Sequence, residues 1–435
     1  MTMLGRLRTN RIRTGLVAAT ALLTVFSGTF HIVVLSILRA NIVAGTSSKL
    51  FLASLFVTVA VLFIGLLSNH RDRFQLNVIV VLLCAYVILA CLLLFTGLGH
   101  YERNPQFDSE VQAYLILMLC SIMSVSLLVA GGDSAQELIY KMVPGLIVIY
   151  TLGTVVSLVF SSGLTTGGLM SDRSGLNYQS NSYCAAYAIG LTLYSMGDLV
   201  PAGKDASVFR PLMPRPISFL LLCIQFSVLV LSGGRGGLVT AFLLVLFWIY
   251  TQRAIIKTNI RLVFVGIIGV AAFILIVFSF LGNSNLEYSG LDRLVSFLDG
   301  GGDSNRSILR TQALNLIAQK PLFGYGAGSI FFLLNTYSHN IFTDIAVEYG
   351  LVGLGIFLLI LFYGLAAMGR LIKRDKREYF WAYIFIMGMS MLLFSSYYLV
   401  SVMCVFPVAY CFVKDSQRPV RADFDCSMRR GIATK

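Results

Sequence analysis

The chain has 435 residues, of which 57% are hydrophobic and only 12% are charged, and its mean hydropathy is +0.82. A soluble domain of this length could not cover its surface with so few charges, so a water-soluble fold is excluded. The net charge of +13 does not indicate a nucleic-acid partner, because the basic residues lie at the ends of apolar segments, where membrane proteins carry them.

Apolar runs of about twenty residues recur along the chain, each long enough to cross a hydrocarbon core of about 30 Å. Helices are predicted for them, since a barrel would show short alternating strands. The first run is too long for a signal peptide and lacks a cleavage site. The predicted fold is all-α: one polytopic transmembrane bundle over residues 1–435, with about twelve spans. The expected spans are 15–38, 50–68, 76–98, 113–130, 142–161, 182–200, 217–234, 236–251, 262–281, 345–368, 379–396 and 398–413.

The distribution of charge predicts the orientation of this bundle. Most of the 33 Lys and Arg residues fall in alternate connections, starting with the N-terminal segment, whereas the acidic residues divide evenly between the two sides. A bias of the basic residues alone follows the positive-inside rule, so both termini are expected in the cytoplasm. The longest polar segment, 282–344, then forms an external loop between the ninth and tenth spans, and a loop of this length is usually functional.

Nothing in the sequence predicts a metal or another cofactor. The eight cysteines include no CxxC pair, and none lies in a predicted external loop. They are interpreted as small buried apolar residues rather than as a disulfide framework. No external cluster of Asp, His and Cys has the spacing of metal ligands.

The long external loop contains one segment with helical periodicity. Residues 305–319 predict an amphipathic helix that Pro321 stops. Arg306 and Arg310 are four residues apart, so both side chains project from one side of that helix and could bind a diphosphate. A solvated helix face is the alternative. The apolar face of the helix is expected to consist of Ile308, Leu309, Ala313, Leu316 and Ile317.

A second arginine site lies between two spans that are joined with almost no loop. Arg235 stands among four glycines in the segment Leu231 to Leu238. Glycines let the chain turn and let a bulky group approach closely. An arginine at the membrane edge is costly unless it faces a polar cavity or an anion, so Arg235 is a candidate anion-binding residue. A snorkelling turn residue is the alternative.

A third candidate site precedes the tenth span. His339 and Asn340 follow Ser338, which is predicted to cap the helix that leads into this span. A lone histidine is often structural, but His339 lies in the same external loop as the arginine pair. Arg173, in another external loop, could join the anion site. The glycine-rich segment 321–329 lacks the lysine of a phosphate-binding loop and is expected to form a tight turn against the membrane surface.

Together, these motifs resemble the O-antigen ligase and polymerase superfamily of bacterial inner-membrane enzymes. The resemblance rests on SGGRGGL, then R-x3-R with PLFGYGAGS, then SHN with EYGLVGL, in that order over residues 231–355. It implies metal-independent, inverting glycosyl transfer from undecaprenyl-diphosphate-linked oligosaccharides at the outer face of the inner membrane. It also implies membrane lipid, a flippase and a chain-length regulator as partners.

The resemblance further implies roles for individual residues. Arg235 and either Arg306 or Arg310 would neutralise the diphosphate leaving group. His339 would position or deprotonate the acceptor hydroxyl, with Arg173 and Asn340 binding substrate. The compact stretch from Arg306 to His339 favours a polymerase that joins repeat units over a ligase that transfers finished glycan to lipid A-core. A transporter of a small anion is a third reading, which the scarcity of ionisable residues at span centres disfavours.

Overall fold

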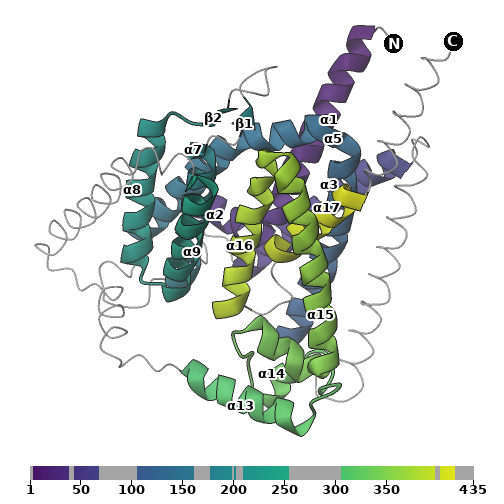
Figure 1. The fold of residues 1–435 in the computed structure, drawn as a ribbon, viewed down its shortest axis with the longest axis vertical. Coiled ribbons are helices and arrows are strands. Elements are labelled where there is room, and N and C mark those ends of the chain that lie inside the picture. Colours follow the sequence, from purple (N-terminus) through teal and green to yellow (C-terminus); the bar gives the residue numbers. More distant parts are fainter. Residues whose placement is uncertain are drawn as a thin grey trace, which may run out of the picture.

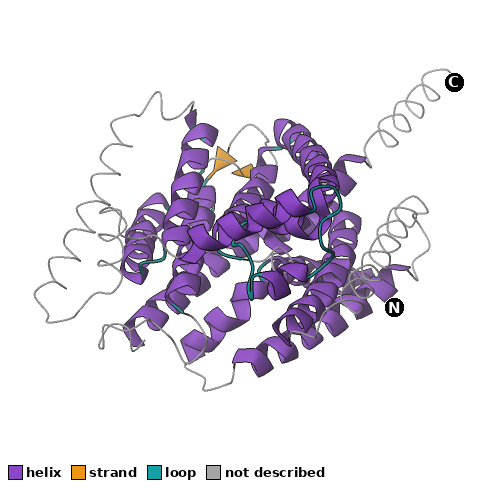
Figure 2. Cartoon of the chain, turned by 90° about the horizontal axis from the view of Figure 1, so that it is seen from below, coloured by secondary structure: helices purple, strands orange, loops and turns teal. Residues whose placement is uncertain are grey.

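The computed structural model describes residues 3–38, 44–67, 105–160, 177–197, 200–201, 209–253, 305–396 and 402–416. These residues are almost entirely helical, as predicted, apart from one two-residue antiparallel pair (Figures 1 and 2). The helices of the first half are α1 (Met3–Val25), α2 (Ser27–Leu38), α3 (Ala44–Leu67), α5 (Pro105–Phe160) and α7 (Tyr178–Met196). The strands are β1 (Val200–Pro201) and β2 (Phe209–Arg210). The second half contains α8 (Arg215–Ser232), α9 (Arg235–Thr251), α13 (Asn305–Gln319), α14 (Ser329–Leu333), α15 (Ile341–Arg374), η1 (Lys376–Glu378), α16 (Tyr379–Phe394) and α17 (Val402–Ser416).

Three of the described helices are long and apolar enough to cross a membrane: α5, α8 and α15. The predicted first span is not one straight helix, because α1 and α2 meet at Phe26 with a bend of 95°, and the pair would count as a fourth crossing. The predicted spans at 113–130 and 142–161 both lie in α5, on either side of a break at Gly132, whose φ of 58° and ψ of −153° are not helical. The predicted spans at 76–98 and 262–281 lie outside the described residues, so the number twelve stays a prediction.

Helix α7 forms the centre of the bundle. Every residue from Asn181 to Ser195 is buried, because α7 contacts α5, α8, α9 and α16. Its small residues permit this close packing; a side chain at Gly190 would collide with Met387 of α16 and Leu244 of α9. Polar side chains in this apolar setting pair across helices, as membrane proteins require. Thr192 of α7, for example, donates to Gln225 of α8 over 3.1 Å.

Helix α15 is broken at Gly350, whose φ of 66° and ψ of −170° are not helical. The break frees two carbonyl groups and two N–H groups, and the glycine-rich loop before α14 pairs all four. Tyr325 and Gly326 donate their N–H groups to the carbonyls of Val347 and Glu348, over 2.9 and 2.8 Å. The N–H groups of Leu351 and Val352 donate in turn to the carbonyls of Pro321 and Leu322, over 2.7 and 3.2 Å. The glycine-rich loop thus supplies the backbone hydrogen bonds that α15 lacks at its break.

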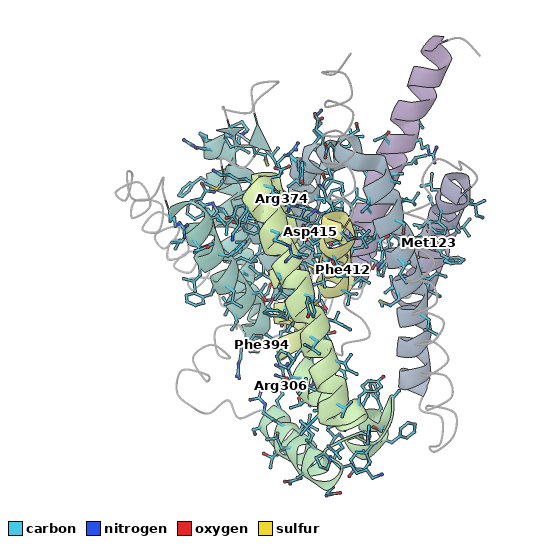
Figure 3. The ribbon with its side chains drawn as sticks, turned by 45° about the vertical axis from the view of Figure 1, so that its right-hand side comes forward. Met123, Arg306, Arg374, Phe394, Phe412 and Asp415 are labelled. Carbon is cyan, nitrogen blue, oxygen red and sulfur yellow. The ribbon has the colours of Figure 1, made fainter. Side chains whose placement is uncertain are left out.

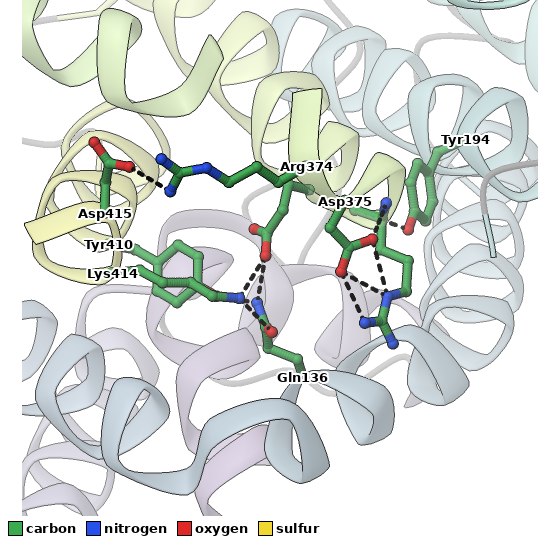
Figure 4. Close-up of polar contacts among 9 residues, drawn as sticks. Gln136, Tyr194, Arg374, Asp375, Tyr410, Lys414 and Asp415 are labelled. Carbon is green, nitrogen blue, oxygen red and sulfur yellow. Dashed lines mark hydrogen bonds and ion pairs between the residues drawn. The ribbon is translucent and has the colours of Figure 1, made fainter. Parts of the chain in front are cut away.

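A buried polar cluster closes the bundle at the end opposite α13. Lys414 of α17 pairs with Glu378 of η1 over 2.5 Å, and their side chains are 13% and 1% exposed. Gln136 of α5 bridges them, accepting from Lys414 over 2.5 Å and donating to Glu378 over 3.0 Å (Figure 4). Beside this cluster Arg377 pairs with Asp375, which lowers the pKa of that carboxyl group despite its partial burial.

Lys414→Met is expected to destabilise the protein by about 3–5 kcal/mol, because it leaves the Glu378 carboxylate buried without its cation. Thermal unfolding of the purified protein in detergent measures the effect. Adding Glu378→Gln to that variant should recover most of the loss. Lys141→Met is the matched control, since the Lys141–Glu137 pair is 64% and 58% exposed and such pairs contribute little. Equal melting temperatures for Lys414→Met and Lys141→Met would contradict a stabilising role for the buried Lys414–Glu378 pair.

Candidate functional site

The end of α16 collects polar side chains from distant parts of the chain. The last carbonyl groups of a helix have no partner within it. Here the Arg306 guanidinium of α13 donates from Nη1 to the Phe394 carbonyl over 2.9 Å, and the Tyr337 hydroxyl donates to the Ser395 carbonyl over 3.3 Å. Figure 3 shows Arg306 beside Phe394, far from the Arg374–Asp415 pair at the other end of the bundle. A cation at the negative end of the helix dipole is also favourable.

The start of α9 lies close to the end of α16, and the Tyr183 side chain of α7 contacts both. The Tyr183 hydroxyl of α7 donates to Ser395 Oγ over 2.8 Å. A Cβ at Gly236 would collide with that hydroxyl and would approach Ser395 Oγ to 3.0 Å. Arg235 is half-buried and is the first residue of α9, immediately before Gly236. Residues of α7, α9, α13 and the end of α16 thus meet around Ser395.

The structure explains why glycines surround Arg235, which the sequence alone did not. Gly233 ends α8 in the left-handed region, with a φ of 67°. Gly234 and Gly237 lie against Ser182 of α7, whose hydroxyl donates to the Gly234 carbonyl over 2.8 Å. The prediction was that these glycines admit a bulky group. In the structure, α7 itself occupies the space beside Gly234, Gly236 and Gly237.

A compact set of hydrogen bonds shapes the loop that carries His339. The fully buried Asp344 carboxylate accepts from both the N–H and the hydroxyl of Ser338, over 2.9 and 2.5 Å. Asn340 caps α15 by accepting from the N–H groups of Phe342 and Thr343. The prediction that Ser338 caps α15 is therefore wrong. Asn340 is the cap, and the Ser338 hydroxyl donates to Asp344 instead. Between these two fixed residues His339 adopts a φ of 61°, which is uncommon for a residue with a side chain.

The surroundings of His339 favour the neutral imidazole. Burial, and after it the positive charge of Arg306, lower the pKa of His339, while a hydrogen bond to the Ser395 backbone acts in the opposite direction. The Tyr337 ring lies 4.4 Å from the imidazole, measured between centroids. Within the described residues, His339 Nδ1 is buried and has no hydrogen-bond partner. A neutral histidine with an unused ring nitrogen suits a general base.

The predicted site residues therefore separate into three groups. Arg306 and His339 share the end of α16, and Arg235 begins the helix that adjoins it. Arg310 is exposed on α13, and Asn340 uses its side-chain oxygen as a helix cap. Arg173 lies outside the described residues.

Helix α13 has the predicted bounds, Asn305–Gln319. Its predicted apolar face is correct for Ala313, Leu316 and Ile317, which pack against Phe331 and Val347. It is wrong for Ile308, which is 59% exposed.

Tyr183, Tyr337 and Ser395 were not predicted from the sequence. Tyr183 and Ser395 lie within apolar runs, where polar groups are expensive unless paired, and that cost was the available signal. No pattern along the chain indicated that they pair with each other across 212 residues.

The described residues contain no group of three or more His, Cys, Asp or Glu side chains that could hold a metal ion. The cations at the site are arginines, which bind phosphate groups through planar, charge-assisted hydrogen bonds. Arg306 thus lies close to a histidine whose surroundings favour the neutral imidazole.

Comparison with known proteins identifies a family for part of the chain. Residues 218–358 match the O-antigen ligase family. The match covers about a third of the chain and includes Arg235, Arg306 and His339. The predicted resemblance to the O-antigen ligase and polymerase superfamily is therefore confirmed for this segment, and the family consists of glycosyltransferase-like membrane enzymes that act on lipid-linked glycans. No curated protein and no solved structure matches the chain.

Proposed function

We propose that this protein is a polymerase that joins undecaprenyl-diphosphate-linked oligosaccharide repeat units by inverting glycosyl transfer. The observation that carries the proposal is the convergence of Arg306 and His339 on Phe394 and Ser395, beside the start of α9. Two guanidinium groups and one neutral imidazole are what a diphosphate leaving group and a hydroxyl nucleophile require.

In the proposed reaction the acceptor hydroxyl oxygen attacks the anomeric carbon of the donor sugar. The bond from that carbon to the diphosphate oxygen breaks, and undecaprenyl diphosphate leaves with the bonding electrons. The hydroxyl proton passes to the imidazole of His339. Arg306 and Arg235 stabilise the negative charge that grows on the leaving group. Attack from the face opposite the diphosphate inverts the anomeric centre, with Arg310, Arg173 and Asn340 as outer substrate contacts.

The proposal includes a location and an orientation. The chain forms one integral domain, residues 1–435, in the inner membrane of a bacterium, with both termini in the cytoplasm and 282–344 in the periplasm. A flippase would deliver the donor, and a chain-length regulator would limit the product. Alkaline phosphatase fused near Asn305 should be active, whereas the same enzyme fused near Lys376 should be silent.

A ligase that transfers glycan to lipid A-core is the second candidate. The observation that favours it is the description of the matching family as O-antigen ligase. Both reactions use the same donor chemistry and differ in the acceptor, so the product distinguishes them.

Transfer is expected to be independent of metal ions, because arginines rather than a divalent cation would stabilise the diphosphate. The purified protein, given a polyprenyl-diphosphate-linked repeat unit, should form longer glycans at the same rate with and without excess EDTA. Released polyprenyl diphosphate and glycan length are measured by mass spectrometry. Loss of activity in EDTA that Mg²⁺ or Mn²⁺ restores would contradict the arginine mechanism.

A further inference from the structure

The turn between α13 and α14 exposes two large apolar side chains. Leu322 is 59% exposed and Phe323 is 75% exposed. No other large apolar side chain with described exposure is as exposed as Phe323. Apolar groups presented together on a rigid turn indicate an interaction surface.

This turn is fixed to the end of a membrane-facing helix. The carbonyls of Pro321 and Leu322 accept from Leu351 and Val352, the first residues after the break in α15. Those residues are themselves 51% and 43% exposed. These two hydrogen bonds hold the turn against α15, and Gly350 is so close to Leu322 that a side chain at position 350 would collide with the Leu322 carbonyl.

The exposed side of α15 continues this apolar surface along the bundle. Only 17% of the most apolar window of α15 is buried, and lipid is the partner of such a face. The exposed residues of this face include Ile356, Leu359, Ile360 and Phe362. From the break to Arg374 the helix is about 36 Å long at 1.5 Å per residue, enough for a hydrocarbon core of about 30 Å. A membrane crossing by α15 that begins at the break is therefore long enough to span the bilayer.

We propose that Leu322 and Phe323 are a membrane anchor inserted into the lipid leaflet at the α13 end of the bundle. Their apolar surface is continuous with the lipid-facing side of α15, which argues for acyl chains rather than a protein partner. Lys320, two residues before Leu322, is exposed, as suits the level of the lipid phosphates. The segment predicted as an external loop thus includes a part that enters the membrane.

The anchor is coupled to the candidate site through backbone bonds. Tyr325 and Gly326 hold the carbonyls of Val347 and Glu348, and the same short segment of α15 carries Asp344, which fixes the loop of His339. The depth of the turn in the leaflet therefore sets the height of the site above the bilayer. The anchor itself does not depend on the proposed reaction.

Tryptophan fluorescence tests the anchor on the full chain. Phe323→Trp is reconstituted in phosphatidylcholine nanodiscs with and without bromine near the top of the acyl chains, and the signal of the wild type, with Trp248 and Trp381, is subtracted. The added fluorescence should be lost in brominated lipid and unaffected by aqueous iodide. Asn315→Trp, at an exposed position of α13, is the matched control and should respond to iodide alone. Equal thermal unfolding of the three proteins shows that they are folded.

Three results would overturn the anchor. Quenching of the Phe323→Trp variant by iodide and not by brominated lipid would place the turn in water. Protection from both quenchers would indicate a protein partner, such as a second copy of the chain. Quenching by brominated lipid that disappears when a polyprenyl diphosphate is added would assign the turn to the lipid tail of the substrate.

Discussion

Arg306→Ala is expected to reduce glycosyl transfer by about a hundredfold to a thousandfold, the usual cost of removing one group that stabilises charge in the transition state. Arg310→Ala is expected to retain most of the activity. The two arginines lie four residues apart on α13, yet only Arg306 is half-buried and bonded to the Phe394 carbonyl. The rate of polyprenyl diphosphate release by the two purified variants measures the difference.

Each variant removes one positive charge from α13. Their comparison therefore separates the effect of the position of the arginine from the effect of net charge. If Arg310→Ala were as inactive as Arg306→Ala, at equal protein level and thermal stability, the end of α16 would not define the site. Equal activity of Arg306→Ala and wild type would return Arg306 to a structural role as a cap on α16.

The charge of Arg306 also predicts a change in pH dependence. Burial lowers the pKa of His339, and the positive charge of Arg306 lowers it further by disfavouring the imidazolium, so the neutral base persists to lower pH than for a solvated histidine. Arg306→Gln removes that charge and should raise the pKa. The acid limb of the kcat/KM profile, where activity is lost as His339 becomes protonated, should then move to higher pH. An unmoved limb would show that His339 is not the titrating group.

His339→Ala is expected to reduce transfer by about a hundredfold to ten-thousandfold, the range for loss of a general base. Protein level and thermal unfolding should change little, since Asp344, Ser338 and Asn340 hold the loop without the imidazole. In cells that make lipopolysaccharide, the ladder of surface polysaccharide and an extract of carrier lipids report the result. A normal ladder in this strain would remove His339 from the mechanism.

What accumulates in the His339→Ala strain separates the two candidate functions. A failed polymerase leaves single repeat units on undecaprenyl diphosphate, and a separate ligase can still transfer them to give lipid A-core with one unit. A failed ligase leaves long polymer on the carrier and bare core at the surface. One-unit core with short carrier glycan supports the polymerase.

Local sequence patterns predicted that the chain is helical, but they did not predict where the helices bend or break. The periodicity of 305–319 and the following Pro321 predicted α13 with its observed bounds. The bend at Phe26 and the pairing of the glycine loop with the break at Gly350 were not predicted, because backbone bonds between distant segments leave no periodic signal. Ser338 and Asn340 are both good capping residues, and only the buried Asp344 decides between them.

The candidate site was predicted as motifs rather than as an assembly. Arg235 was identified from the cost of a charge at the membrane edge, Arg306 from its spacing to Arg310, and His339 from its place in the same external loop. The common partner of Arg306 and His339, the end of α16, was missed. Arg306 reaches Phe394 across 88 residues of sequence, and the carbonyl groups that receive it belong to any helix end, so no residue type marks them.

The most direct test of the central claim uses the purified wild-type protein and one defined substrate. A polyprenyl-diphosphate-linked repeat unit is incubated with the protein, and carrier-linked glycans and released polyprenyl diphosphate are measured together by mass spectrometry. The account predicts glycans of two and more units on the carrier, one released diphosphate for each bond formed, and an inverted anomeric configuration at each new linkage. Release of the diphosphate without longer glycan, or longer glycan with retained configuration, would contradict it.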